Sequence, residues 1–255
     1  MSEAFTEQGY LALLRAFLAR GYAVAGYDDA DPAARHLILR HDLDMSLGAA
    51  EPIAALESAL SVKAHYFVLL RTEMYNPFSA AARATLENLR RLGHEVGLHF
   101  DASVHGGDPQ GLEDAAAREC RVLEDALGAP VRFVSFHRPA AALLARRGTI
   151  AGRRHTYEPR FFSEMGYCSD SRGGWHYGPP LDHRAVAEGR ALQLLTHPIW
   201  WVGSVPGDPV ATLDRFRAVR DRVLARELAA NCDPYRAARG AAPPAFKGKI
   251  GDEQG

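Results

Sequence analysis

The stretch HLILRHDLD, residues 36–44, joins a short apolar run to a cluster of reactive side chains. Residues 36–40 have the pattern of a buried strand. A helix-type pattern follows over residues 47–60, and a second strand-type run covers residues 64–70. A strand, a helix and a second strand in this order predict parallel pairing through a right-handed crossover.

The same alternation continues along the chain. It predicts an α/β fold whose strands form either a barrel or an open doubly wound sheet, and in both architectures catalytic groups lie at the carboxyl ends of the strands. We expect one domain over residues 1–238 and a disordered tail over residues 239–255, which are rich in glycine, proline and charge. Further strands are expected at residues 94–100, 131–136, 167–169 and 191–195, and further helices at residues 6–20, 78–92, 112–127 and 210–230.

Composition excludes several classes of protein. The chain has 255 residues, 47 % apolar and 24 % charged, as in ordinary globular proteins. Its net charge of -1 gives no electrostatic reason to expect nucleic acid or an anionic membrane as a partner. No apolar run has the roughly 18–20 residues of a membrane span, and the amino-terminal residues lack a signal-peptide core, so we expect a cytoplasmic protein. The scattered Cys120, Cys168 and Cys232 indicate neither a disulfide framework nor a cysteine zinc site.

Reactive side chains follow directly after each of the apolar strand runs. Helix capping explains an isolated Asp or Ser at such a place, but it does not call for His and Arg. Parallel strands bring their carboxyl ends to one rim, so these side chains are expected to converge on a shared site. The junctions are HDLD at 41–44, RTE at 71–73, HFD at 99–101, HRP at 137–139, DSR at 170–172 and THP at 196–198.

The chemistry of such a set is narrow. Carboxylates, histidines and an arginine suit a divalent metal that polarises a carbonyl and activates water. One carboxylate off the metal can act as general base, and a histidine on the other side can protonate the leaving group. A serine hydrolase is disfavoured because the chain has no GxSxG elbow, and a dinucleotide site because no GxGxxG follows the first strand.

Five segments in order carry a resemblance to a known family. HDLD, GHEVGLH, HRP, SDSRGGW and LLTHP resemble the five motifs of polysaccharide deacetylases, the carbohydrate esterases of the chitooligosaccharide deacetylase type. The resemblance spans roughly residues 37–201. It implies a distorted, incomplete (β/α) barrel with the active site at the carboxyl ends of the strands, in agreement with the alternation of strands and helices.

The resemblance also implies catalytic roles. Asp42 matches the general base, His197 the general acid, and Arg138 the arginine that orients the base. Asp170 and Trp175 resemble the motif that supports the acid histidine and forms a wall of the acetyl pocket. The implied reaction is attack of metal-bound water on an N- or O-acetyl carbonyl, followed by protonation of the departing amine or alcohol.

The metal ligands include one departure from the family. Asp44 matches the metal-binding aspartate and His99 the first metal histidine, but Ser103 stands where the family has its second histidine. We favour Asp101 as the replacement ligand, because strand alternation points it towards the same face as His99. Two further candidates remain open, His105 and His137. Zinc is the expected metal.

Two tryptophans after the last strand fit either of two descriptions. Trp200 and Trp201 are candidates for a sugar-binding surface and equally for core or interface positions. The leading hypothesis is a metal-dependent hydrolase that removes an acyl group from an amino sugar or a sugar-linked intermediate in surface-polysaccharide assembly. The alternatives are a catalytically inactive carbohydrate-binding homologue, which Ser103 motivates, and an amidase acting on a non-sugar C–N bond.

Overall fold

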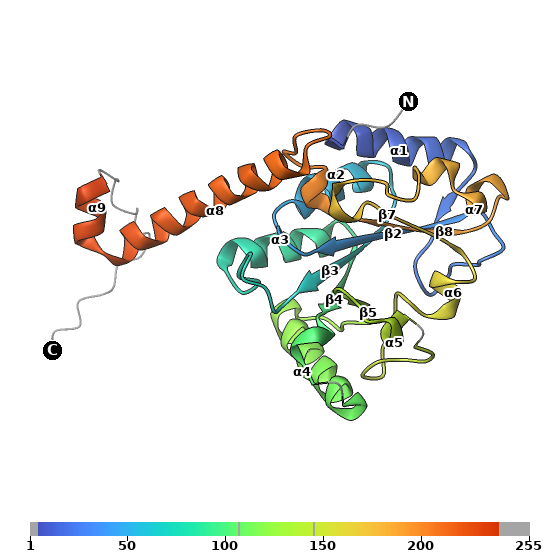
Figure 1. Ribbon diagram of the computed structural model, residues 1–255, viewed down its shortest axis with the longest axis horizontal. Coiled ribbons are helices and arrows are strands. Elements are labelled where there is room, and N and C mark those ends of the chain that lie inside the picture. The colour runs from blue at the N-terminus through green and yellow to red at the C-terminus, as the bar shows by residue number, and fades with distance from the viewer. Residues whose placement is uncertain (1–4, 107, 145, 240–255) are drawn as a thin grey trace. The chain divides into compact units, whose positions relative to one another are not determined.

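The structure is a computed structural model that describes residues 5–239 apart from 107 and 145 (Figure 1). The chain divides into two compact units, Met1–Pro209 and Val210–Gly255. The sheet and the candidate site belong to the first unit. Helices α8 (Pro209–Asn231) and α9 (Asp233–Arg239) form the described part of the second. One domain over residues 1–238 stays a prediction, and residues 240–255 of the expected tail lie outside the described residues.

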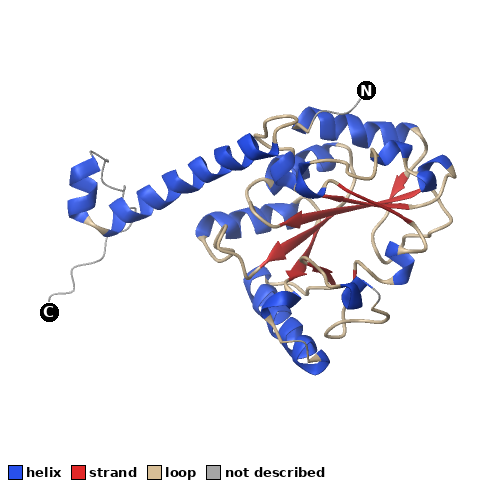
Figure 2. Cartoon of the chain, in the orientation of Figure 1, coloured by secondary structure: helices blue, strands red, loops and turns tan. Residues whose placement is uncertain are grey.

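A curved parallel sheet forms the centre of the first unit (Figures 1 and 2). Its strands follow the order β6-β5-β4-β3-β2-β8-β7, with β1 paired to the start of β2, and every pairing is parallel. Among the described strands, the end strands β6 and β7 do not pair with each other, so the barrel is incomplete. The strands are β1 Ala23–Val24, β2 His36–Leu43, β3 His65–Leu69, β4 Glu95–Phe100, β5 Phe133–Phe136, β6 Arg154–His155, β7 Gly166–Ser169 and β8 Leu192–Thr196.

Helices surround the outer side of the sheet (Figure 2). Local signals set where they begin and end: Thr6, Ser79 and Asp108 each accept a hydrogen bond from a backbone N–H in the first turn of the helix that follows. Gly128 ends α4 in the left-handed conformation, at φ 61°. The helices are α1 Glu7–Ala19, α2 Ala50–Ala59, α3 Ala80–Arg91, α4 Pro109–Leu127, α5 Ala141–Leu144, α6 Pro159–Phe162 and α7 Arg184–Ala187.

The α/β class and the incomplete barrel are confirmed. The strand predicted at 36–40 extends through Leu43, so Asp42 lies inside β2 rather than after it. Strands β1 and β6 and helices α5 to α7 were not predicted, because elements of two to four residues are too short to show a hydrophobic period. None of the helices within residues 5–239 combines the length and apolar character that a bilayer crossing requires.

Strand β2 has buried polar side chains on both of its faces. Residue His41 points towards the helices, where its Nε2 lies 2.7 Å from Oε1 of Glu57 on α2. The hydroxyls of Tyr10 and Tyr66 donate to the same carboxylate at 2.5 and 2.6 Å. Burial acts to raise the pKa of Glu57, but His41, His94 and the Tyr10 hydroxyl together outweigh burial and hold the pKa below its usual value. This network joins α1, α2, β2 and β3 around one buried carboxylate.

Removing the charge of Glu57 should therefore destabilise the fold. We expect Glu57→Gln to lower the free energy of unfolding by about 3 kcal/mol at neutral pH, because it breaks a buried ionic contact. The deficit should shrink as the pH falls, because a carboxyl whose pKa is lowered in the folded state loses its stabilising effect on protonation. Urea unfolding at several pH values measures both effects.

Glu87→Gln is the matched control. Glu87 pairs with Arg83 at the surface, with side chains 60 % and 74 % exposed, so its loss should cost at most about 0.5 kcal/mol. Equal costs for the two substitutions would contradict a structural role for the Glu57 network.

Candidate active site

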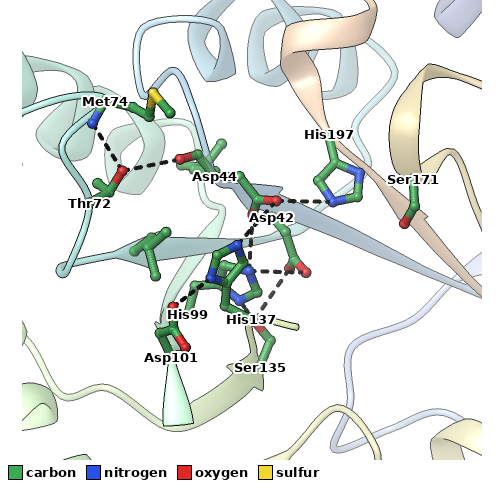
Figure 3. Close-up of polar contacts among 12 residues, drawn as sticks. Asp42, Asp44, Thr72, Met74, His99, Asp101, Ser135, His137, Ser171 and His197 are labelled. Carbon is green, nitrogen blue, oxygen red and sulfur yellow. Dashed lines mark hydrogen bonds and ion pairs between the residues drawn. The ribbon is translucent and has the colours of Figure 1, made fainter. Parts of the chain in front are cut away.

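Polar side chains from the ends of four strands gather at the carboxyl edge of the sheet. Figure 3 shows Asp42, Asp44, His99, His137 and His197 pointing towards one another. They come from β2, the end of β4, and the positions that follow β2, β5 and β8. The tyrosine after β3, Tyr75, fixes this edge: its hydroxyl accepts from the backbone N–H of Leu69 and donates to the carbonyl of Leu43, at 3.0 and 2.7 Å.

Three of these residues form a group that could hold a metal ion. One ligand atom each of Asp44, His99 and His137 lies within 4.8 Å of the others, and this is the one such group found in the described part of the chain. Nε2 of His99 is 3.0 Å from Oδ1 of Asp44, and Nε2 of His137 is 3.8 Å from Oδ2. Burial acts to raise the pKa of Asp44, but the neighbouring imidazoles outweigh it and keep the carboxylate ionised.

Hydrogen bonds behind the two histidines determine which ring nitrogen carries the proton. The Ser135 hydroxyl donates to Oδ1 of Asp42 at 3.3 Å, so its oxygen is left to accept from Nδ1 of His99, 2.5 Å away. Asp101 is a carboxylate and can only accept, so Nδ1 of His137 donates to it at 2.9 Å. In the neutral imidazoles both Nε2 atoms therefore present lone pairs towards Asp44.

This donor set fits a divalent cation. Oδ1 of Asp44 is buried and has no hydrogen-bond donor among the described residues, although Nε2 of His99 is 3.0 Å away. Two lone pairs at this distance repel each other unless a proton or a cation lies between them. Two imidazoles and one carboxylate, with further positions open, are donors typical of a catalytic zinc site.

The three candidates for the replacement ligand occupy different places. His137 belongs to the donor group, whereas Asp101 lies behind it and accepts from His137, from the backbone N–H of Ser103 at 3.0 Å and from the Ser103 hydroxyl at 2.6 Å. His105 stacks on Phe100 and lies 3.2 Å from Oε1 of Glu119. Ser103, which stands where the resemblance led us to expect a histidine, thus donates two hydrogen bonds to Asp101.

Asp42 is held by an arginine that the sequence analysis did not single out. Arg40 Nε donates to Oδ1 of Asp42 at 3.0 Å and Nη2 to Oδ2 at 2.7 Å. Burial acts to raise the pKa of Asp42, but Arg40, with His99 and His197, outweighs burial and holds the pKa below its usual value. Arg138, the arginine expected here, has an exposed side chain and a backbone φ of 47°. Strand alternation was the available signal, because residues two apart share a face.

His197 and Asp170 form a second buried pair. Nδ1 of His197 donates to Oδ1 of Asp170 at 2.6 Å, and the backbone N–H of His197 lies 3.0 Å from both carboxylate oxygens. Nε1 of Trp201 donates to Oδ2 at 2.7 Å. Burial acts to lower the pKa of His197, but the Asp170 carboxylate, together with Asp44 and Asp42, outweighs burial and raises the pKa to about 9. The imidazole is therefore charged at neutral pH, and its Nε2 lies 3.7 Å from Oδ2 of Asp44.

The tryptophans contribute mainly to the wall behind this pair. Trp201 is 1 % exposed and packs against Phe5 and Tyr10, with ring centroids 4.6 and 5.5 Å away, and Trp200 is 6 % exposed. Both therefore occupy core positions rather than an open sugar-binding surface. Trp175 is half-buried, with its centroid 6.0 Å from that of Trp201, so it is the one of the three with side-chain surface left for a substrate.

Comparisons with known proteins give a likeness of fold. No protein-family model and no curated protein matches the chain. Among solved structures, a family 4 carbohydrate esterase from Bacillus anthracis is similar at 15 % identity and a TM-score of 0.43, over 83 % of this chain and 86 % of that one. A family 4 esterase from Streptococcus mutans has 15 % identity and a TM-score of 0.46, over 75 % and 84 %. A family 4 pseudoenzyme from Bacillus anthracis has 12 % identity and a TM-score of 0.42, over 75 % and 62 %.

The His197–Asp170 pair predicts a measurable titration in the metal-free protein. The His197 imidazole should titrate near pH 9, and Asp170→Asn should lower that pKa by about 1–2 units, because the charged imidazole loses its carboxylate partner. A raised folded pKa means that the pair stabilises the fold fully below pH 6.5 and loses this effect as the pH rises through about 9. Nitrogen-15 NMR of the histidine side chains follows the titration.

The control is Asp101→Asn, which removes a carboxylate that contacts His137 instead. It should leave the His197 titration in place. A pKa near 6.5 in the wild-type protein would contradict the assignment of Asp170 as the partner that charges His197.

Proposed function

We propose that the protein is a metal-dependent deacetylase that removes an acyl group from an amino sugar or a sugar-linked intermediate. The observation that carries the proposal is one arrangement. The donor group Asp44, His99 and His137 lies next to an ionised carboxylate, Asp42, and a charged histidine, His197. A base and an acid beside a metal site are what acyl transfer to water requires.

The residues divide the work as follows. Asp44, His99 and His137 would hold the ion, which when bound polarises the acyl carbonyl and activates water. Asp42, with Oδ2 3.7 Å from Nε2 of His99, takes the proton of the attacking water. His197 gives its Nε2 proton to the departing nitrogen or oxygen.

Several finer points belong to the same proposal. Zinc is the metal we expect, since two imidazoles and a carboxylate are common zinc donors. Trp175 is the aromatic side chain proposed to form a wall of the acyl pocket. Asp101 is proposed as the carboxylate that orients His137 rather than as a ligand, because both its oxygens are already engaged. A cytoplasmic location stays a prediction.

The ligand assignment predicts which variants lose metal. Wild-type protein should bind about one equivalent of zinc in calorimetry, and His99→Ala or His137→Ala should abolish binding, because each removes a direct donor. Asp101→Asn should weaken binding by roughly 10–100-fold, as expected for a group that only orients a ligand. His105→Ala is the control and should bind as the wild type does. Metal retained in His137→Ala but lost in Asp101→Asn would make Asp101 the ligand.

Turnover tests the reaction itself. With zinc, cobalt, nickel or manganese, the protein should release acetate from a panel of acetylated amino sugars, nucleotide-linked sugars and lipid-linked sugars. Asp42→Asn should lower kcat by about 10²–10⁴-fold, because it removes the general base, and should keep the metal.

Two other outcomes would overturn the proposal in different ways. Sugar binding without turnover under any of the metals would indicate a catalytically inactive carbohydrate-binding homologue. Release from acylated amines that lack a sugar, but from no sugar, would indicate an amidase. Ser103 is the reason to consider an inactive homologue, and the place of His137 in the donor group supports the active one.

A further inference from the structure

Arg40 is a fully buried charged side chain at the candidate site. It lies on β2, two residues before Asp42, and is 0 % exposed. Its guanidinium stands over the ring of Tyr157, 4.7 Å from the centroid, and Nη2 lies 3.2 Å from the Tyr157 hydroxyl. On its other side it makes the two parallel hydrogen bonds to Asp42, at 3.0 and 2.7 Å.

This geometry constrains the Asp42 carboxylate more than a charge alone would. A planar guanidinium that binds both oxygens fixes the plane of the carboxylate as well as its position. The Ser135 hydroxyl adds a third contact on Oδ1 at 3.3 Å. With its orientation fixed on these sides, Asp42 keeps Oδ2 near the metal donors, 3.7 Å from Nε2 of His99.

Burying the Arg40 guanidinium costs free energy of folding, which argues that the ion pair with Asp42 has a function. A buried guanidinium loses its hydration, and Nη1 of Arg40 is buried without a hydrogen-bond partner among the described residues. Such a cost is offset only when the partner geometry is good. An apolar side chain at position 40 would avoid it, so the presence of arginine needs a reason at Asp42.

We propose that Arg40 is the positioning residue for the general base Asp42, and that Tyr157 holds Arg40 in place. The resemblance gave this role to Arg138, whose side chain is exposed. The inference rests on the proposed function for the role of Asp42 as base. The contact itself, between Arg40 and Asp42, can be tested without turnover.

The first experiment measures the coupling between the two residues by thermal unfolding of the full chain. Arg40→Met should lower the Tm by about 10 °C, because it leaves a buried carboxylate without its partner. The double variant Arg40→Met with Asp42→Asn should unfold at a higher temperature than Arg40→Met alone. The matched cycle of Arg138→Met with Asp42→Asn should be additive. Additive effects in the Arg40 cycle would overturn the proposal, and recovery of folding in the double variant would support it even if Arg40→Met alone does not fold.

The second experiment separates positioning from packing by kinetics. Arg40→Lys keeps the charge but cannot bind both oxygens in one plane, so kcat should fall by about 100-fold while KM and the zinc content stay within twofold of the wild type. Tyr157→Phe, which keeps the ring, should lower kcat by a smaller factor, and Arg138→Lys and Arg138→Met should leave it unchanged. Full kcat in Arg40→Lys, or a loss of kcat confined to the Arg138 variants, would overturn the role of Arg40.

Together the two experiments distinguish a failure of the proposed function from a failure of the role of Arg40. A wild-type protein that binds zinc but hydrolyses none of the acylated sugars or amines contradicts the proposed function, and the positioning role falls with it. The unfolding cycle still decides whether Arg40 holds Asp42. An active wild type whose Arg40→Lys variant keeps full kcat leaves the function standing and removes only the role of Arg40.

Discussion

The pleat of strand β2 is the constraint on which the rest of the structure depends. Successive side chains of a strand point to opposite faces, so Arg40 and Asp42 point towards the site while His41, between them, points towards the helices. The strand pairs with β3 on one side and β8 on the other. A shift of register by one residue would exchange the two buried polar sets and leave both without partners. The Arg40–Asp42 pair on the site face and the Glu57 network on the helix face therefore fix the same register of β2.

Neighbouring strand ends allow one site to be assembled from different positions in the sequence. Strands β4 and β5 pair with His99 opposite Ser135, and the backbone N–H of His137 donates to the carbonyl of Phe100 at 2.9 Å, which extends the ladder by one step. This register brings His137 beside Asp101 and near Asp44. A histidine after β5 thus completes the donor group with Asp44 and His99.

The sequence allowed six of the strands, their parallel pairing and the rim of reactive side chains to be predicted, because hydrophobic period and strand-end chemistry are local features. Arg40 was not predicted as a site residue, because it lies at the end of an apolar run whose pattern indicates only a buried strand. The choice between Asp101 and His137 depends on the register between β4 and β5, which no local pattern encodes. The sequence does not distinguish a core position from a surface position for Trp201. The structure does, because the indole N–H donates to the buried Asp170.

The hydrogen bonds around Asp170 have a consequence for the direction of proton movement. Nδ1 of His197 donates to one oxygen of Asp170, Nε1 of Trp201 donates to the other, and the backbone N–H of His197 lies within hydrogen-bond distance of both. Nδ1 of His197 is the donor in its contact with Asp170, because a carboxylate can only accept. The only proton this imidazole can release is the one on Nε2, on the side of Asp44. The His197–Asp170 pair therefore exchanges a proton with the site through one atom: the proton leaves from Nε2, and a proton returns to Nε2.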